Sequence, residues 1–165
     1  MRDDTTGGVP DPEPDDPRER RGSYALAMTA YVVLAAGAAT VVRRRHLRLP
    51  DVTTRDVVLT ALATQRVSRV LARDPITSPI RAPFTEFVGV SGPAQLEERA
   101  VDTSRLKHTV GELITCPFCL GQWVGTGFVV AQVLWPRAAR IVTAGFAAIG
   151  LADHLHHLER RLRSS

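Results

Sequence analysis

Two long uncharged stretches dominate the chain, at residues 24–42 and 113–135. A helix rises about 1.5 Å per residue, so each stretch is close to the roughly 30 Å that a bilayer core requires. We therefore predict a membrane-spanning helix at each position. The first stretch is preceded by Arg20 and Arg21 and followed by Arg43, Arg44 and Arg45. A cleaved signal peptide has a shorter apolar region and no such cluster after it, so we expect a retained span.

Residues 52–73 have a helical pattern of apolar positions, interrupted late in the segment by Arg66 and Arg69. Two interpretations remain open. The helix spans the membrane and its arginines extend toward the far surface, or it lies along the interface. In either case the two arginines could hold a lipid phosphate.

A further helix is predicted at 138–158, where only 141–152 is strongly apolar. The segment 74–112 contains Pro75, Pro79 and Pro83, which predict a loop, with room for a short helix near 93–101. Residues 1–22 are acidic and rich in proline, which is typical of disorder. The expected fold is all-α: a small polytopic helical membrane protein with three to four membrane helices, one cytoplasmic loop region and a basic tail at 159–165.

Charge adds an orientation. The chain has a formal net charge of +4 and only 5% aromatic residues. Its arginines flank apolar segments, so we expect a lipid bilayer as partner and no nucleic acid. Short cytoplasmic loops are enriched in Lys and Arg, which places the tail and the 73–112 loop in the cytoplasm of a multi-pass cell-membrane protein. The N-terminus is then cytoplasmic if 52–73 spans, and external if it does not.

The segment Cys116-Pro117-Phe118-Cys119 is the most chemically suggestive part of the sequence. Three interpretations remain open. The thiols form a redox pair, they contribute to a zinc site, or they only cap and pack a helix. Zinc requires about four ligands, so His154 and His157, or a second copy of the chain, would have to complete the site. No other catalytic constellation is present, which argues against an enzyme.

Gly121 and Gly125 follow the cysteines at a spacing that allows close helix approach in membranes. We expect them to pack against 138–158 within the chain; dimerisation through this face is the alternative.

Two blocks of residues resemble a bacterial membrane family catalogued as domain of unknown function 1360. The first block runs from Leu59 to Phe84, the second from Gly111 to Trp123, and the resemblance extends over about 52–155. The positions that match the family's motifs are Arg66, Arg69, Asp74, Arg81, Pro83, Glu112, Cys116, Pro117, Cys119 and Trp123. The resemblance implies a family core at 52–158, preceded by an added first span. It also implies that the Arg66-bearing helix inserts, and it implies no activity; nothing in these residues supports the sporulation label that some members carry.

These observations lead to one main hypothesis and two alternatives. The first is a non-enzymatic accessory or scaffold component, which works through its cytoplasmic loop and its cysteine-bearing helix end. It would act with a membrane protein partner or as a homodimer. The second is a zinc-binding membrane protein. The third is a thiol–disulfide oxidoreductase with Cys116 as nucleophile and Cys119 as resolving thiol.

Overall fold

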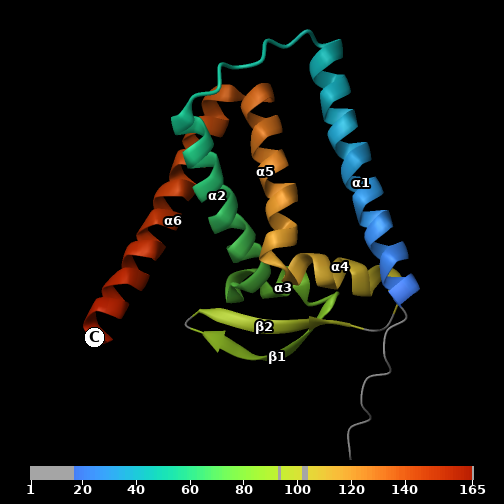
Figure 1. Ribbon diagram of the computed structural model, residues 1–165, viewed down its shortest axis with the longest axis vertical. Helices are drawn as coiled ribbons and strands as arrows, with labels where there is room; N and C mark the ends of the chain where they lie inside the picture. The colour runs from blue at the N-terminus through green and yellow to red at the C-terminus, as the bar shows by residue number, and fades with distance from the viewer. Residues whose placement is uncertain (1–16, 93, 102–103, 165) are drawn as a thin grey trace, which may run out of the picture.

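The computed structural model describes residues 17–92, 94–101 and 104–164. Four long helices alternate in direction, and a smaller unit, which contains the β1–β2 hairpin and is called the hairpin unit below, lies between the second and third of them at one end of the molecule (Figure 1). The elements in chain order are α1 Pro17–Arg44, α2 Thr54–Arg73, the 3-10 turn η1 Pro75–Thr77, α3 Ser78–Arg81, β1 Thr85–Gly92, β2 Gln95–Ala100, α4 Arg105–Thr115, α5 Pro117–Leu134 and α6 Pro136–Ser164.

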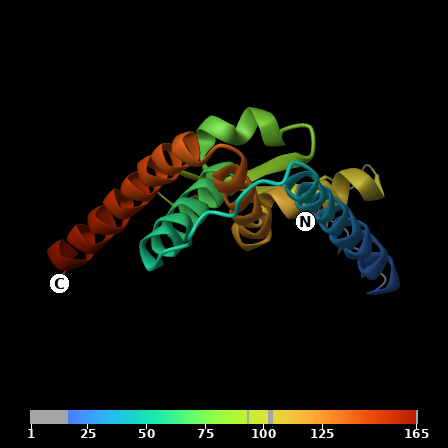
Figure 2. The same cartoon turned by 90° about the horizontal axis from the view of Figure 1, so that it is seen from above.

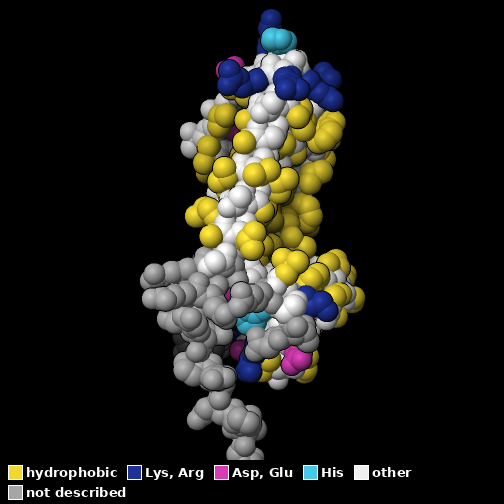
Figure 3. All heavy atoms as spheres, turned by 90° about the vertical axis from the view of Figure 1, so that its right-hand side faces the viewer, with side chains coloured by type: hydrophobic (Ala, Val, Ile, Leu, Met, Phe, Trp, Pro, Cys, Tyr) yellow, Lys and Arg dark blue, Asp and Glu magenta, His cyan; other side chains and the backbone are white. Residues whose placement is uncertain are grey.

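Three of the long helices are long and apolar enough to cross a membrane: Tyr24–Arg44, Pro117–Leu134 and Pro136–Arg163. The α2 helix is not among them, yet it runs beside α5 and α6 at the same height (Figure 1). Seen from above, the four helices form a curved row with α6 and α1 at its two ends (Figure 2). Figure 3 shows the α1 side, where apolar side chains fill a band below a cluster of arginines.

Local sequence signals explain where the helices begin and end. The Thr53 side chain accepts a hydrogen bond from the Asp56 amide, and the Asp56 carboxylate accepts one from the Thr53 amide, which together form a capping box at the start of α2. Pro117 occupies the first turn of α5, and the residue before a proline is driven into an extended conformation. The chain therefore bends at Cys116, and the predicted span 113–135 is divided between α4 and α5.

The expectation of an all-α fold is wrong in one region. β1 and β2 form an antiparallel hairpin within the segment predicted to be a loop, and β2 occupies most of the 93–101 stretch, for which the sequence left room for a short helix. Side chains alternate along β2: Leu96 and Glu98 are more buried than Glu97 and Arg99, which is the two-residue period of a strand. The predicted disorder of 1–22 is also wrong for 17–22, which begin α1; residues 1–16 lie outside the described part.

Small residues bring the long helices close together. Gly150 of α6 lies against α2, where an added Cβ would be 3.3 Å from the Leu62 carbonyl oxygen. Gly125 of α5 faces Thr64 of α2, and Gly121 faces Ser68. The prediction that these two glycines pack against the last helix is therefore wrong, because their neighbour is α2. The Gln132 side chain also donates to Thr60 across the α2–α5 interface at 2.8 Å.

Candidate functional site

The centre of the hairpin unit is an ion pair between Arg81, at the end of α3, and Glu98 of β2. The two side chains are only 2% and 3% exposed, and Arg81 Nε lies 2.7 Å from Glu98 Oε2. Arg81 Nη2 also donates to Glu98 Oε1 at 3.0 Å, so the contact is bidentate. A charge pair that is this deeply buried requires hydrogen bonds for all of its remaining polar atoms.

Those hydrogen bonds are present. All five N–H donors of Arg81 form hydrogen bonds. Two of them bond Glu98, and the other three bond the Leu71 carbonyl, the Asp74 carbonyl and the Thr77 hydroxyl. Glu98 accepts two further hydrogen bonds, from Ser78 at 2.7 Å and Thr85 at 2.9 Å. The network therefore joins the end of α2, the η1–α3 turn and both strands. It fixes the hairpin to the end of α2.

This network sets the protonation of Glu98. Burial acts to raise the pKa of Glu98, but the hydrogen bonds from Arg81, Ser78 and Thr85 together outweigh burial and hold the pKa below its ordinary value. A carboxyl group with a lowered folded-state pKa contributes stability above its unfolded-state pKa and loses it as the pH falls through the folded value.

We therefore expect acid to loosen the hairpin. The thermal midpoint of the purified protein should exceed that of a Glu98→Gln variant at neutral pH. The difference should shrink as the pH falls through the lowered pKa of Glu98. A difference that stays constant over an acid titration would contradict this assignment.

A second set of charges lies between α2 and α6. Arg66 Nη1 is 2.8 Å from Asp153 Oδ2, with the two side chains 20% and 29% exposed. Arg69 Nη1 lies 3.5 Å from His157 Nε2, whereas His154 Nδ1 bonds its own helix at the Gly150 carbonyl. Arg66 thus has an intramolecular counter-charge.

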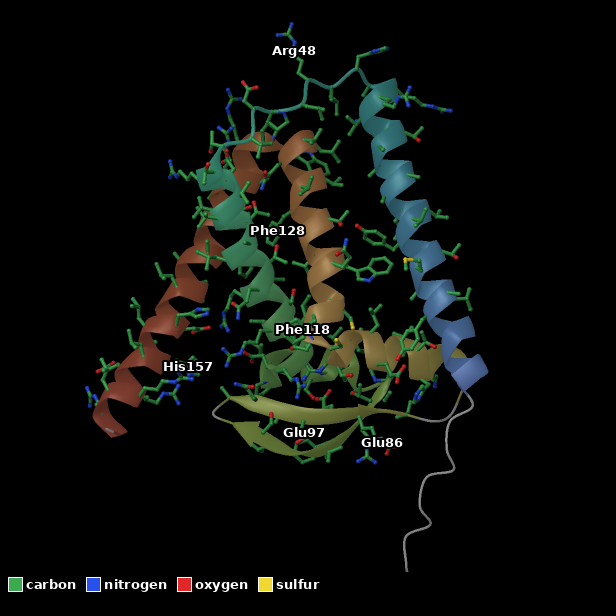
Figure 4. The ribbon with its side chains drawn as sticks, viewed as in Figure 1. Arg48, Glu86, Glu97, Phe118, Phe128 and His157 are labelled. Atoms are coloured by element: carbon green, nitrogen blue, oxygen red, sulfur yellow. The ribbon has the colours of Figure 1, made fainter. Side chains whose placement is uncertain are left out.

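The cysteines lie at the α4–α5 junction. Cys116 is the N-cap of α5, and its sulfur accepts a hydrogen bond from the Cys119 amide at 3.2 Å. Both thiols are free, and Cys119 is exposed. Phe118, which lies between them in sequence, projects near the foot of α5, while His157 projects from α6 (Figure 4). Within the described ranges, no three His, Cys, Asp or Glu side chains gather closely enough to hold a metal ion. The zinc site that combines both cysteines with His154 and His157 therefore does not assemble within one chain.

The remaining motif positions have structural contacts. Asp74 caps η1 by accepting from the Ile76 amide at 3.1 Å, and Pro83 is exposed just after α3. Glu112 of α4 accepts from the Tyr24 hydroxyl at 3.2 Å, and Trp123 packs edge-on against Tyr31 with ring centroids 5.4 Å apart. Tyr24 and Tyr31 thereby join α1 to the rest of the bundle.

Glu98 and its hydroxyl partners Ser78 and Thr85 are absent from the sequence-based candidates. One signal could have identified the carboxylate. Leu96, Glu98 and Ala100 alternate with the charged Glu97 and Arg99, so a strand pattern puts Glu98 on the inward face. Pro75, Pro79 and Pro83 favour a loop over the wider segment, and this short alternation is too brief to outweigh them.

The comparisons with known proteins agree with the resemblance found in the sequence. Over 112 residues, the chain is 29% identical to a protein named "Sporulation protein YjcA" from Bacillus subtilis (strain 168); the match covers 62% of this chain and 88% of that protein. No solved structure matches the chain. The family model described as "Protein of unknown function (DUF1360)" matches residues 59–159. The match includes α2, the hairpin, the cysteine segment and most of α6, and the chain therefore belongs to this family.

Proposed function

We propose that the protein is a non-enzymatic accessory protein of the cell membrane, which docks a protein partner on its hairpin. The observation that carries this proposal is the buried Arg81–Glu98 network, because it holds a two-stranded hairpin rigidly at the end of a membrane bundle. A freely moving loop would need no such network. A fixed surface loses little conformational entropy when a partner binds, which favours docking.

The outer strand has the character of a docking surface. β2 packs against α4 and α2, whereas β1 lies on the side away from the helices (Figure 1). The described sheet has two strands, so one edge of β1 is unpaired. Phe87 and Val90 on this strand are 65% and 71% exposed. An exposed apolar edge strand is a template for an added strand from another chain.

The proposed orientation places the hairpin in the cytoplasm. Basic residues are more numerous at the hairpin end, where they include Arg73, Arg81, Arg99, Arg105, Lys107, Arg160, Arg161 and Arg163, together with Arg18, Arg20 and Arg21 at the start of α1. The opposite end carries Arg43, Arg44, Arg45, Arg48, Arg55, Arg137 and Arg140. Arg48 lies far from Glu86 and Glu97 of the hairpin (Figure 4). The larger number of basic residues at the hairpin end favours a cytoplasmic hairpin. The chain would then cross the membrane four times, with α2 as one of the spanning helices.

Single cysteines test the orientation. In a Cys116→Ser, Cys119→Ser background, Leu49→Cys should react with an impermeant thiol reagent added to intact cells, and Ser91→Cys should react only after the membrane is permeabilised. Leu49 is 72% exposed in the α1–α2 linker, and Ser91 is exposed in β1, so accessibility within the protein does not limit either reaction. Labelling of Ser91→Cys from outside would overturn the proposed orientation.

A photo-crosslinking residue tests the docking. Placed at Val90 in the native host, it should give one protein adduct of defined mass, which the same residue at the lipid-facing Val33 position should not give. The adduct should persist in the Cys116→Ser, Cys119→Ser variant, because the proposal requires no thiol chemistry. Absence of an adduct would overturn docking at β1, and loss of the adduct in the cysteine variant would favour the oxidoreductase hypothesis.

A further inference from the structure

A long groove lies between α2 and α5 on the surface of the bundle. It has a volume of about 1130 Å³, somewhat above the roughly 300–1000 Å³ of most small-molecule sites. Its floor is open because the residues there are small, among them Ala61, Thr64, Gly121 and Gly125. Phe118, which is 92% exposed, stands at its hairpin end. The walls are largely apolar, and both helices lie at the height of the predicted membrane spans.

The hairpin end of this groove is positively charged. Arg69, Arg73 and Gln95 line it, and the same three side chains line an adjoining polar pocket of about 240 Å³. The two acids of that pocket are already engaged: Asp153 pairs with Arg66, and Asp74 caps η1.

The arginines of the groove therefore lack acidic partners. Arg69 has a hydrogen bond to His157, and within the described residues no carboxylate pairs with Arg69 or Arg73. Arg160 of the polar pocket adds further positive charge. An anion at this end of the groove would find guanidinium donors that are not committed to another charge.

We propose that the groove binds an anionic phospholipid, with an acyl chain along α2 and α5 and the phosphate at Arg69 and Arg73. The positive charge of Arg69 and Arg73 at one end of an apolar groove favours a lipid over a second copy of the chain. A second copy of the α2–α5 face would bring the same arginines against their counterparts, and like charges across an interface are unfavourable. An anionic lipid instead offers a long apolar chain and a negative group at one end, in the order that the groove presents them. This binding site is independent of partner docking at β1.

Native mass spectrometry of the purified full chain tests the proposal. Phosphatidylglycerol and phosphatidylcholine of identical acyl chains would be titrated in a mild detergent. Wild type should retain phosphatidylglycerol preferentially. The Arg69→Gln, Arg73→Gln variant should bind phosphatidylglycerol roughly 30-fold more weakly, since each arginine near an anionic headgroup contributes on the order of a factor of five. The matched Arg43→Gln, Arg44→Gln variant removes the same charge at the opposite end and should bind as wild type does.

A second variant tests the groove itself and does not depend on charge. Ala61 is exposed in the groove, so Ala61→Phe should fill the volume and weaken binding of both lipids while the circular dichroism spectrum stays unchanged. Equal retention of the two lipids by wild type, or equal losses in the two arginine variants, would overturn the proposal. So would a photo-crosslinker at position 61 that yields a dimer or a peptide adduct instead of a lipid adduct.

Discussion

Replacing Arg81 with alanine should release the hairpin from the end of α2. The substitution leaves the Glu98 carboxylate buried and without its counter-charge, and removing one partner of a buried ion pair costs about 3–5 kcal/mol. It also removes the donors to the Leu71 and Asp74 carbonyls. Hydrogen exchange of the β1 and β2 amides in detergent or nanodiscs should rise steeply, while exchange in α5 should change little.

Arg99 provides a matched control for this substitution. It is an arginine next to Glu98 on the same strand, but it faces solvent. Arg99→Ala should leave hairpin exchange within error of wild type. Arg81→Lys should give an intermediate result, because a lysine keeps the charge but cannot reproduce the planar fork of donors. Hairpin amides in Arg81→Ala that stay as protected as in wild type would show that the ion pair does not hold the hairpin in place.

Gly111→Ala is expected to separate α4 from the hairpin. A Cβ at this position would lie 2.5 Å from the Phe84 carbonyl oxygen and 2.7 Å from Ala100 Cβ. The Phe84 oxygen is itself held by a hydrogen bond from the Val101 amide at 3.1 Å, so the backbone has little freedom to move away. Overpacking of this kind typically costs about 1–3 kcal/mol. The thermal midpoint should fall, and exchange should rise in α4 and β2 together.

A glycine in open space provides the control, and its substitution with alanine should change the thermal midpoint in the opposite direction or leave it unchanged. An added Cβ at Gly37 of α1 meets nothing within 4 Å. Gly37→Ala should be neutral or stabilising, because alanine favours a helix over glycine by up to about 1 kcal/mol. Equal thermal midpoints for Gly111→Ala and Gly37→Ala would refute the close packing described at Gly111.

The sequence predicted the apolar helices well because their signal is local. A run such as 24–42 is long enough to identify a span without any knowledge of its neighbours. The hairpin was missed because β1 has no apolar alternation: Phe87, Val88 and Val90 are all exposed, so burial on one face does not mark the strand. A two-stranded sheet that is held by one buried ion pair needs no alternating apolar side chains. The sequence of either strand therefore carries too weak a signal to predict the hairpin.

The candidate residues were predicted only in part, because their partners in the fold lie far away in the sequence. Arg81 appeared through the family resemblance, but its partner Glu98 comes from a strand 17 residues later. Arg66 was expected to extend to the membrane surface or to bind lipid, and its pairing with Asp153 depends on how α2 and α6 pack. The histidines and cysteines were each identified in sequence, but their separation in space could only follow from the arrangement of the helices.

The Arg66–Asp153 pair has a consequence for biosynthesis. α2 is not apolar enough to count as a candidate span, and its counter-charge belongs to α6, which is translated after α5. While the ribosome is still making α5, α2 carries an unneutralised arginine, for which the translocon-insertion cost is about 2.5–3.5 kcal/mol at a helix centre. We therefore expect α2 to wait at the membrane surface and to enter together with α6. In a nascent chain arrested before residue 136, α2 should remain accessible to a water-soluble reagent.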